Sequence, residues 1–130
     1  SIHIAEEIQR QCVKDDYSMD ILLEINIGCE EAKTGFLYEE VHDACLQIAE
    51  FDRVHIKGLM SVPPICEDEK KLRAYFARIY KLYIDIRSEK IDNIDMGILS
   101  LCMTGDYKTA VSEGSNLVRI GSGIFGARTY

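Results

Sequence analysis

Two short polar, glycine-rich segments near the end of the chain combine residue types that suit an anion such as a phosphate. The first is Met103-Thr104-Gly105-Asp106 and the second is Arg119-Ile120-Gly121-Ser122-Gly123. Thr104 can cap a helix, so that its hydroxyl and the neighbouring amides face an anion. Backbone amides beside Gly121 and Gly123 can approach a phosphate closely and form an anion-binding nest. The region from Leu99 to Arg128 is therefore predicted to form one wall of a site for a phosphate-bearing cofactor.

Arg119 stands inside a short apolar run, which is unusual for a charged residue. Alternation along an extended segment places Leu117, Arg119 and Gly121 on one face, with Val118 and Ile120 on the other. A buried arginine is costly unless it meets a partner. That partner is either a carboxylate in a structural ion pair or a ligand, and the adjacent glycines favour a ligand. Glycine-rich segments also form ordinary turns, so the motif alone leaves both interpretations open.

The elements that must position these segments alternate along the chain. Hydrophobic periodicity predicts helices at 1–15, 36–51, 67–88 and 107–113, and strands at 21–27, 54–62, 96–103 and 117–120. Strands separated by helices pair in parallel through right-handed crossovers. Four such units are half of the eight in a closed barrel, where phosphates bind at the carboxyl ends of the strands. An open doubly wound sheet usually carries GxGxxG after its first strand, and that motif is absent. The pattern favours an α/β fold of the (βα)8 TIM-barrel type.

Composition narrows the functional classes. The chain of 130 residues is 47% hydrophobic and carries a net charge of -7, which disfavours nucleic acid as a partner. Neither a membrane-spanning run nor a signal region is expected. The five cysteines form no CxxC pair and the three histidines form no cluster, so we expect no metal site, and we expect reduced thiols in the cytoplasm. Because the chain begins at Ser1, a preceding segment is expected.

Five blocks of sequence, in order along the chain, match one known family. They are Leu22–Ile27, Glu30–Phe36, Lys57–Pro63, Leu99–Tyr107 and Val118–Arg128. Together they resemble the YggS/PROSC family, the pyridoxal phosphate homeostasis proteins, over essentially the whole chain. The resemblance implies an alanine-racemase-like barrel that binds pyridoxal 5′-phosphate (PLP) as a Schiff base. Residues 1–130 would then be the C-terminal half of a single PLP-binding barrel domain.

The same resemblance implies a role for each candidate residue. Arg119 would approach the pyridine nitrogen, while Met103, Thr104, Gly121 and Ser122 would surround the phosphate. A guanidinium can only donate hydrogen bonds, so the pyridine nitrogen would remain an unprotonated acceptor and the ring a poor electron sink. The resemblance therefore predicts PLP binding and intracellular PLP homeostasis without turnover, with PLP-dependent apoenzymes as recipients. No catalytic residue is assigned.

Two other functional interpretations stay open. A racemase-like PLP enzyme would need a second acid or base, for which Tyr107 and Tyr130 are candidates by residue type alone. A truncated fragment without independent function is the other interpretation. Half a barrel exposes unpaired strand edges and an apolar face, so we expect the isolated chain to self-associate or aggregate.

The sequence departs from the family pattern at two places. Cys102 stands where the family usually has glycine, and its side chain is expected close to the cofactor. The Schiff-base lysine of the family is expected in a part of the barrel that precedes this chain. Lys33 and Lys57 do not stand at the imine-forming position, and Lys33 is interpreted as a solvated surface residue.

Overall fold

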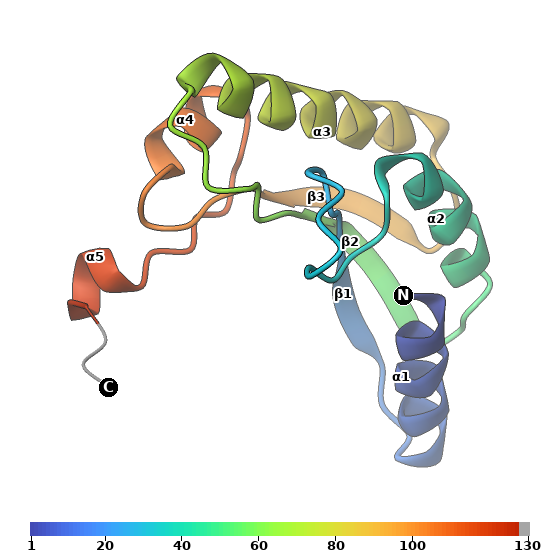
Figure 1. The fold of residues 1–130 in the computed structure, drawn as a ribbon. Coiled ribbons are helices and arrows are strands. Elements are labelled where there is room, and N and C mark those ends of the chain that lie inside the picture. The colour runs from blue at the N-terminus through green and yellow to red at the C-terminus, as the bar shows by residue number, and fades with distance from the viewer. Residues whose placement is uncertain (128–130) are drawn as a thin grey trace.

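A computed structural model describes residues 1–127, in which helices and strands alternate (Figure 1). Arg128 and Tyr130, which the sequence analysis singled out, lie outside the described residues. The elements are α1 (Ile2–Lys14), β1 (Met19–Glu24), the 3₁₀ turn η1 (Tyr38–Glu40), α2 (Val41–Ala49), β2 (Val54–Met60), α3 (Glu69–Glu89), β3 (Ile94–Ser100), α4 (Tyr107–Ser112) and α5 (Ser122–Phe125).

The three strands form one parallel sheet in the order β1-β2-β3. Parallel pairing of consecutive strands is what the alternation of helices and strands predicts. An irregularity in β2 separates Ile56 from Gly58 in both pairings. Gly58 has a φ of +155°, and a Cβ at this position would lie 1.8 Å from the carbonyl oxygen of Ile98. Only glycine allows the two backbones to approach so closely.

Helices α1, α2 and α3 lie on one side of the sheet and bury its apolar side chains (Figure 1). Leu23, Leu59 and Leu99 share one row of the register and are at most 3% exposed. Their sequence neighbours Leu22 and Ile98 project to the other face and are only half-buried. The helical contribution to the core comes from a stripe at three- and four-residue spacing on α3, namely Leu72, Phe76, Ile79, Tyr83 and Ile86.

The ends of α3 follow from local chemistry. The carboxylate of Asp68 accepts hydrogen bonds from the amides of Lys70 and Lys71, which satisfies two free donors of the first turn. Lys90 adopts the left-handed conformation (φ 51°) and ends the helix. The prediction of a helix at 67–88 is thus confirmed to within two residues. In contrast, α2 begins only at Val41, because Phe36 is extended and pairs with the end of β1.

The predicted fourth strand at 117–120 is wrong except for a single parallel bridge between Leu117 and Ser100. Side chains occupy the main-chain sites of β3 that a further strand would use. Asn116 Oδ1 accepts the Leu99 amide at 2.7 Å, and Ser115 Oγ accepts the Leu101 amide at 3.2 Å. The predicted alternation is also absent from the burial pattern, since Leu117 and Val118 are 38% and 42% exposed.

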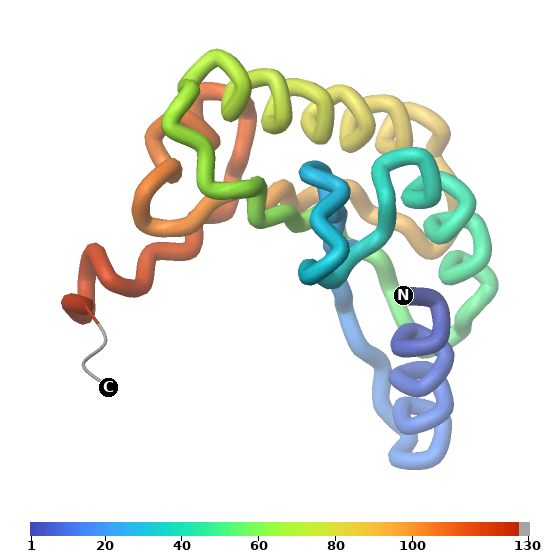
Figure 2. Tube along the Cα trace, viewed as in Figure 1, coloured from blue at the N-terminus to red at the C-terminus, as the bar shows by residue number. Residues whose placement is uncertain are grey.

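After this bridge the chain leaves the sheet and ends in the short helix α5 (Figure 2). The architecture is that of a partial barrel, a parallel sheet with helices on one face. None of the helices within residues 1–127 is long and apolar enough to cross a membrane.

Candidate functional site

The candidate residues gather at the carboxyl ends of the parallel strands, the edge at which barrels bind their ligands. Main-chain bonds bring the segments together there. The Ser61 amide donates to the Ser100 carbonyl at 2.9 Å, and the Leu117 amide donates to the Leu99 carbonyl at 3.2 Å. The loops after β2 and β3 and the segment from 117 onward therefore share one edge.

Thr104 and the glycines of the last segment are in direct contact. The Thr104 hydroxyl oxygen accepts hydrogen bonds from the amide of Gly121, at 3.1 Å, and from the amide of Gly123, at 3.4 Å. A Cβ at Gly123 would lie 2.8 Å from Thr104 Cγ2, whereas a Cβ at Gly121 would meet nothing within 4 Å. A hydroxyl oxygen thus faces two exposed amides, and open space lies beside Gly121. The structure thus brings Thr104 and the glycine-rich turn into contact, which the sequence analysis did not predict.

Arg119 is half-buried and reaches back across the strand ends. Its Nη2 donates to the main-chain carbonyl of Ser61 at 3.0 Å. Its Nε is buried and has no partner among the described residues. Of the two interpretations that the sequence left open, the structural ion pair is not the contact observed, because the bonded acceptor is a carbonyl rather than a carboxylate.

Cys102 lies next to Arg119 but does not project into open space. Its side chain is fully buried and belongs to the hydrophobic core. Burial raises the pKa of the thiol, and the backbone amide of Arg119 partly offsets that rise in pKa. The expected intrusion of this side chain into a ligand site is therefore not observed. The neighbouring Ser100 hydroxyl is buried without a partner within residues 1–127.

Met103 and Ser122 lie at the same end of the sheet and are both exposed. The Met103 amide donates to the carboxylate of Asp106 at 2.7 Å and is therefore already satisfied. The Met103 side chain lines an apolar cavity of about 320 Å³ together with Pro63, Pro64 and Ile65. Ser122 is the first residue of α5. Sequence reasoning assigned no role to Ser61 or Asp106, although an aspartate three residues after Met103 is a common turn signal.

Lys33 and Lys57, the two lysines considered in the sequence analysis, both lie within 4 Å of a carboxylate. Lys33 Nζ lies 2.6 Å from Glu30 Oε2 and 3.4 Å from the Pro63 carbonyl oxygen. Lys57 Nζ lies 3.8 Å from a carboxylate oxygen of Asp95. Lys33 is thus an exposed residue in an ion pair with Glu30, which agrees with its interpretation as a surface lysine.

No group of three metal-ligating side chains occurs within the described range 1–127. The cysteines are free, and three of the five, Cys12, Cys45 and Cys102, are buried. The strand-end edge presents backbone amides, a hydroxyl and a guanidinium as groups that an anion could contact.

Comparison with known proteins agrees with this geometry. The model of the family described as "Alanine racemase, N-terminal domain" matches residues 1–129. The pyridoxal phosphate homeostasis protein of Aquifex aeolicus is 34% identical over 128 residues, which cover 98% of this chain and 55% of the relative. The chain therefore spans about half the length of the curated relatives that it matches.

Two solved structures have the same fold. A protein of unknown function from Bifidobacterium adolescentis superposes with a TM-score of 0.91 and 32% identity, over 96% of this chain and 50% of the other. PipY of Synechococcus elongatus with PLP bound superposes with a TM-score of 0.83 and 23% identity, over 97% and 57%. The resemblance to the pyridoxal phosphate homeostasis proteins is confirmed, and the chain belongs to the alanine racemase N-terminal domain family.

Proposed function

We propose that the strand-end edge formed by Met103, Thr104, Arg119, Gly121 and Ser122 is part of a site for PLP. The observation that carries this proposal is Arg119, whose guanidinium is tied to the Ser61 carbonyl through one nitrogen while its buried Nε has no partner within residues 1–127. An unpaired buried donor is costly, and an acceptor atom on a ligand would relieve that cost. The pyridine nitrogen of PLP is such an acceptor.

The phosphate would lie against Thr104 and the start of α5. In the structure, the amides of Gly121 and Gly123 already point at an oxygen, that of the Thr104 hydroxyl. Phosphate oxygens are stronger acceptors than a hydroxyl, and these amides carry no side chain that would block their approach. The open space beside Gly121 leaves room for the group.

A site of this kind holds its cofactor without promoting strong carbanion chemistry. PLP supplies an electron sink when its ring nitrogen is protonated, and a guanidinium cannot provide that proton. Arg119 would therefore orient the ring and keep its nitrogen unprotonated. These properties suit a cofactor carrier, and we propose that the protein acts in PLP homeostasis with PLP-dependent apoenzymes as recipients. The matching proteins of Aquifex aeolicus and Pasteurella multocida are named pyridoxal phosphate homeostasis proteins.

The proposal is tested by equilibrium dialysis of PLP against this chain and its Arg119→Met variant. Loss of a charge-assisted hydrogen bond should weaken binding about tenfold or more. Arg87→Met, in the last turn of α3, is the matched control and should bind like the parent. Equal affinity of the parent and Arg119→Met, or no binding by the folded parent, would contradict the proposal.

A racemase-like activity is the competing function, and the position of Tyr107, its candidate acid or base among the described residues, does not favour it. Tyr107 is half-buried and packs against the hydrophobic core at the start of α4. A group that packs in this way is poorly placed to exchange protons with a substrate. Turnover of alanine enantiomers well above the rate with free PLP would favour the enzyme over the carrier.

A further inference from the structure

Ser61 lies where the main-chain hydrogen bonding on both sides of β2 ends. It directly follows β2 and is fully buried. Its amide donates to the Ser100 carbonyl at 2.9 Å, on the β3 side. On the β1 side, the Ile25 amide donates to the carbonyl of Met60 at 2.8 Å. In each of the two ladders the next hydrogen bond comes from a side chain instead of the main chain.

On the β1 side this donor is the Ser61 hydroxyl. A regular parallel ladder would continue with the Val62 amide donating to the Ile25 carbonyl. Within the described residues the Val62 amide makes no main-chain hydrogen bond, and the Ser61 hydroxyl donates to the Ile25 carbonyl at 2.6 Å. Since Ile25 and Ser61 are both buried, the hydroxyl satisfies an acceptor that would otherwise be costly to bury.

On the β3 side the donor is Arg119. In a regular ladder the Cys102 amide would be the next donor to the Ser61 carbonyl. That amide makes no main-chain hydrogen bond within residues 1–127, and Arg119 Nη2 donates to the Ser61 carbonyl at 3.0 Å. A guanidinium is planar and rigid, so an acceptor that holds Nη2 also restricts the direction of Nε.

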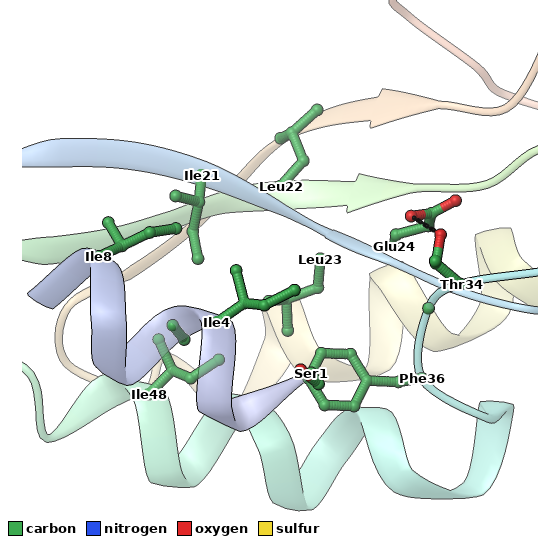
Figure 3. Close-up of a pocket in the computed structure, with 12 residues that line it drawn as sticks. Ser1, Ile4, Ile8, Ile21, Leu22, Leu23, Glu24, Thr34, Phe36 and Ile48 are labelled. Carbon is green, nitrogen blue, oxygen red and sulfur yellow. Dashed lines mark hydrogen bonds between the residues drawn. The ribbon is translucent and has the colours of Figure 1, made fainter.

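The Ile25 carbonyl, to which the Ser61 hydroxyl is bonded, belongs to a strand end that its own loop holds. The Phe36 amide donates to the Glu24 carbonyl at 2.8 Å, and Phe36 forms a parallel bridge with Ile25. Figure 3 shows the Thr34 hydroxyl beside the Glu24 carboxylate, to which it donates a hydrogen bond at 2.9 Å. The hydroxyl of Ser61 is therefore bonded to a fixed part of the chain.

We propose that Ser61 is a positioning residue of the strand-end site, because its hydroxyl fixes the carbonyl that directs the Arg119 guanidinium. Alanine at this position would offer the same carbonyl to Arg119, but without the hydroxyl that bonds to Ile25. The consequence for PLP binding rests on the proposed function. The consequence for the Arg119 side chain does not depend on any ligand.

Hydrogen exchange at Arg119 Nε, followed by NMR on the isotope-labelled chain, tests the proposal in the absence of PLP. This nitrogen is buried in the parent, and its hydrogen should exchange slowly. Arg119→Lys identifies the signal, which must disappear in that variant. In Ser61→Ala the hydrogen should exchange about tenfold faster or more, because the guanidinium loses its fixed acceptor. Ser61→Thr retains the hydroxyl and should restore most of the slow exchange.

Asn93→Gly is the matched control for a general loss of stability. The Asn93 side chain donates to the carbonyls of Phe51 and Val54, at the amino end of β2, and glycine suits its φ of 65°. This variant should unfold more easily in urea without faster exchange at Arg119 Nε. The proposal is overturned by unchanged exchange in Ser61→Ala, by equal acceleration in Asn93→Gly, or by a Ser61→Thr variant that exchanges as fast as Ser61→Ala.

Equilibrium dialysis of PLP separates this proposal from the proposed function. Where the parent binds PLP, Ser61→Ala should bind about fivefold more weakly or worse, and Asn93→Gly should bind like the parent. Faster exchange at Arg119 Nε together with unchanged PLP affinity would show that Ser61 does not position the site for its ligand. A folded parent that binds no PLP contradicts the proposed function, and the exchange measurement then still decides whether Ser61 directs Arg119.

Discussion

The loop after β1 and the segment after β3 both lie at the carboxyl ends of strands, yet they treat their polar groups differently. In the first, Asn26 accepts a hydrogen bond from the Glu30 amide at 3.1 Å and donates one to the Glu30 carbonyl at 2.8 Å. The buried Glu30 Oε2 has no hydrogen-bond partner within residues 1–127, but it lies 2.6 Å from Lys33 Nζ of the same loop. In the second, the buried Arg119 Nε has no partner within residues 1–127, and the same holds for the buried hydroxyl of Ser100 at the end of β3. Polar groups that pair within a loop stabilise the fold, whereas buried donors without a partner mark the place where a ligand is expected.

The largest contrast should come from two glycines. Gly58→Ala should destabilise the protein by about 3 kcal/mol or more, since its Cβ would lie 1.8 Å from the Ile98 carbonyl oxygen and its φ is +155°. Gly121→Ala should change the free energy of unfolding by less than ~0.5 kcal/mol, because its Cβ would meet no atom within 4 Å. It should weaken PLP binding instead, because this Cβ would occupy the open space proposed for the phosphate. Urea unfolding and PLP dialysis of both variants measure the difference. Similar losses of stability would show that Gly121 is packed as tightly as Gly58 of β2.

The substitution Asn26→Ala should cause the next largest loss in the free energy of unfolding. Asn26 is 8% exposed, and its removal would leave main-chain groups of Glu30 unpaired. We expect a loss of about 2 kcal/mol in the free energy of unfolding, measured in urea. Asn116→Ala provides the comparison in the second region, where the exposed side chain should cost less. An effect of Asn116→Ala larger than that of Asn26→Ala would reverse the comparison.

Thr104 separates stability from binding within the second region. Thr104→Ala removes a hydroxyl that can donate a hydrogen bond to a phosphate, and it should weaken PLP binding several-fold. The lost contacts with the amides of Gly121 and Gly123 should cost ~1 kcal/mol of stability or less. Thr104→Ser keeps the hydroxyl and should restore the affinity. If the serine variant binds as weakly as the alanine variant, the methyl contact to Gly123 matters rather than the hydroxyl.

The smallest effect is expected far from both loops, where His42 of α2 contacts Glu89 of α3 at 2.9 Å. The hydrogen bond with Glu89 raises the pKa of His42. The contact therefore makes its full contribution to the free energy of unfolding at pH values below the ordinary histidine pKa. This contribution is lost as the pH rises through the raised pKa of His42. Because His42 is 40% exposed, solvent screening keeps the contribution below about 1 kcal/mol. Comparing the unfolding of parent and Glu89→Gln at about pH 5.5 and pH 9 measures it, and an equal difference at both pH values would contradict this assignment.

The hydrophobic period predicted the elements that carry the core. β2 begins at Val54 as expected, and α3 covers 69–89 against an expected 67–88. These predictions hold because burial of one helical stripe or one strand face leaves a direct trace in the sequence. The pattern failed at 117–120, where the residues have strand propensity but the edge of β3 is occupied by Ser115 and Asn116.

The candidate site divides in the same way. The residue types and their order determined that an arginine, a hydroxyl and a glycine-rich turn follow two neighbouring strands. Only the tertiary structure decided that Thr104 meets Gly121, that Arg119 reaches Ser61 and that Cys102 turns into the core. The physical reason is that local sequence sets propensity and side-chain period, whereas hydrogen bonds between residues up to 58 positions apart depend on how the strands are placed.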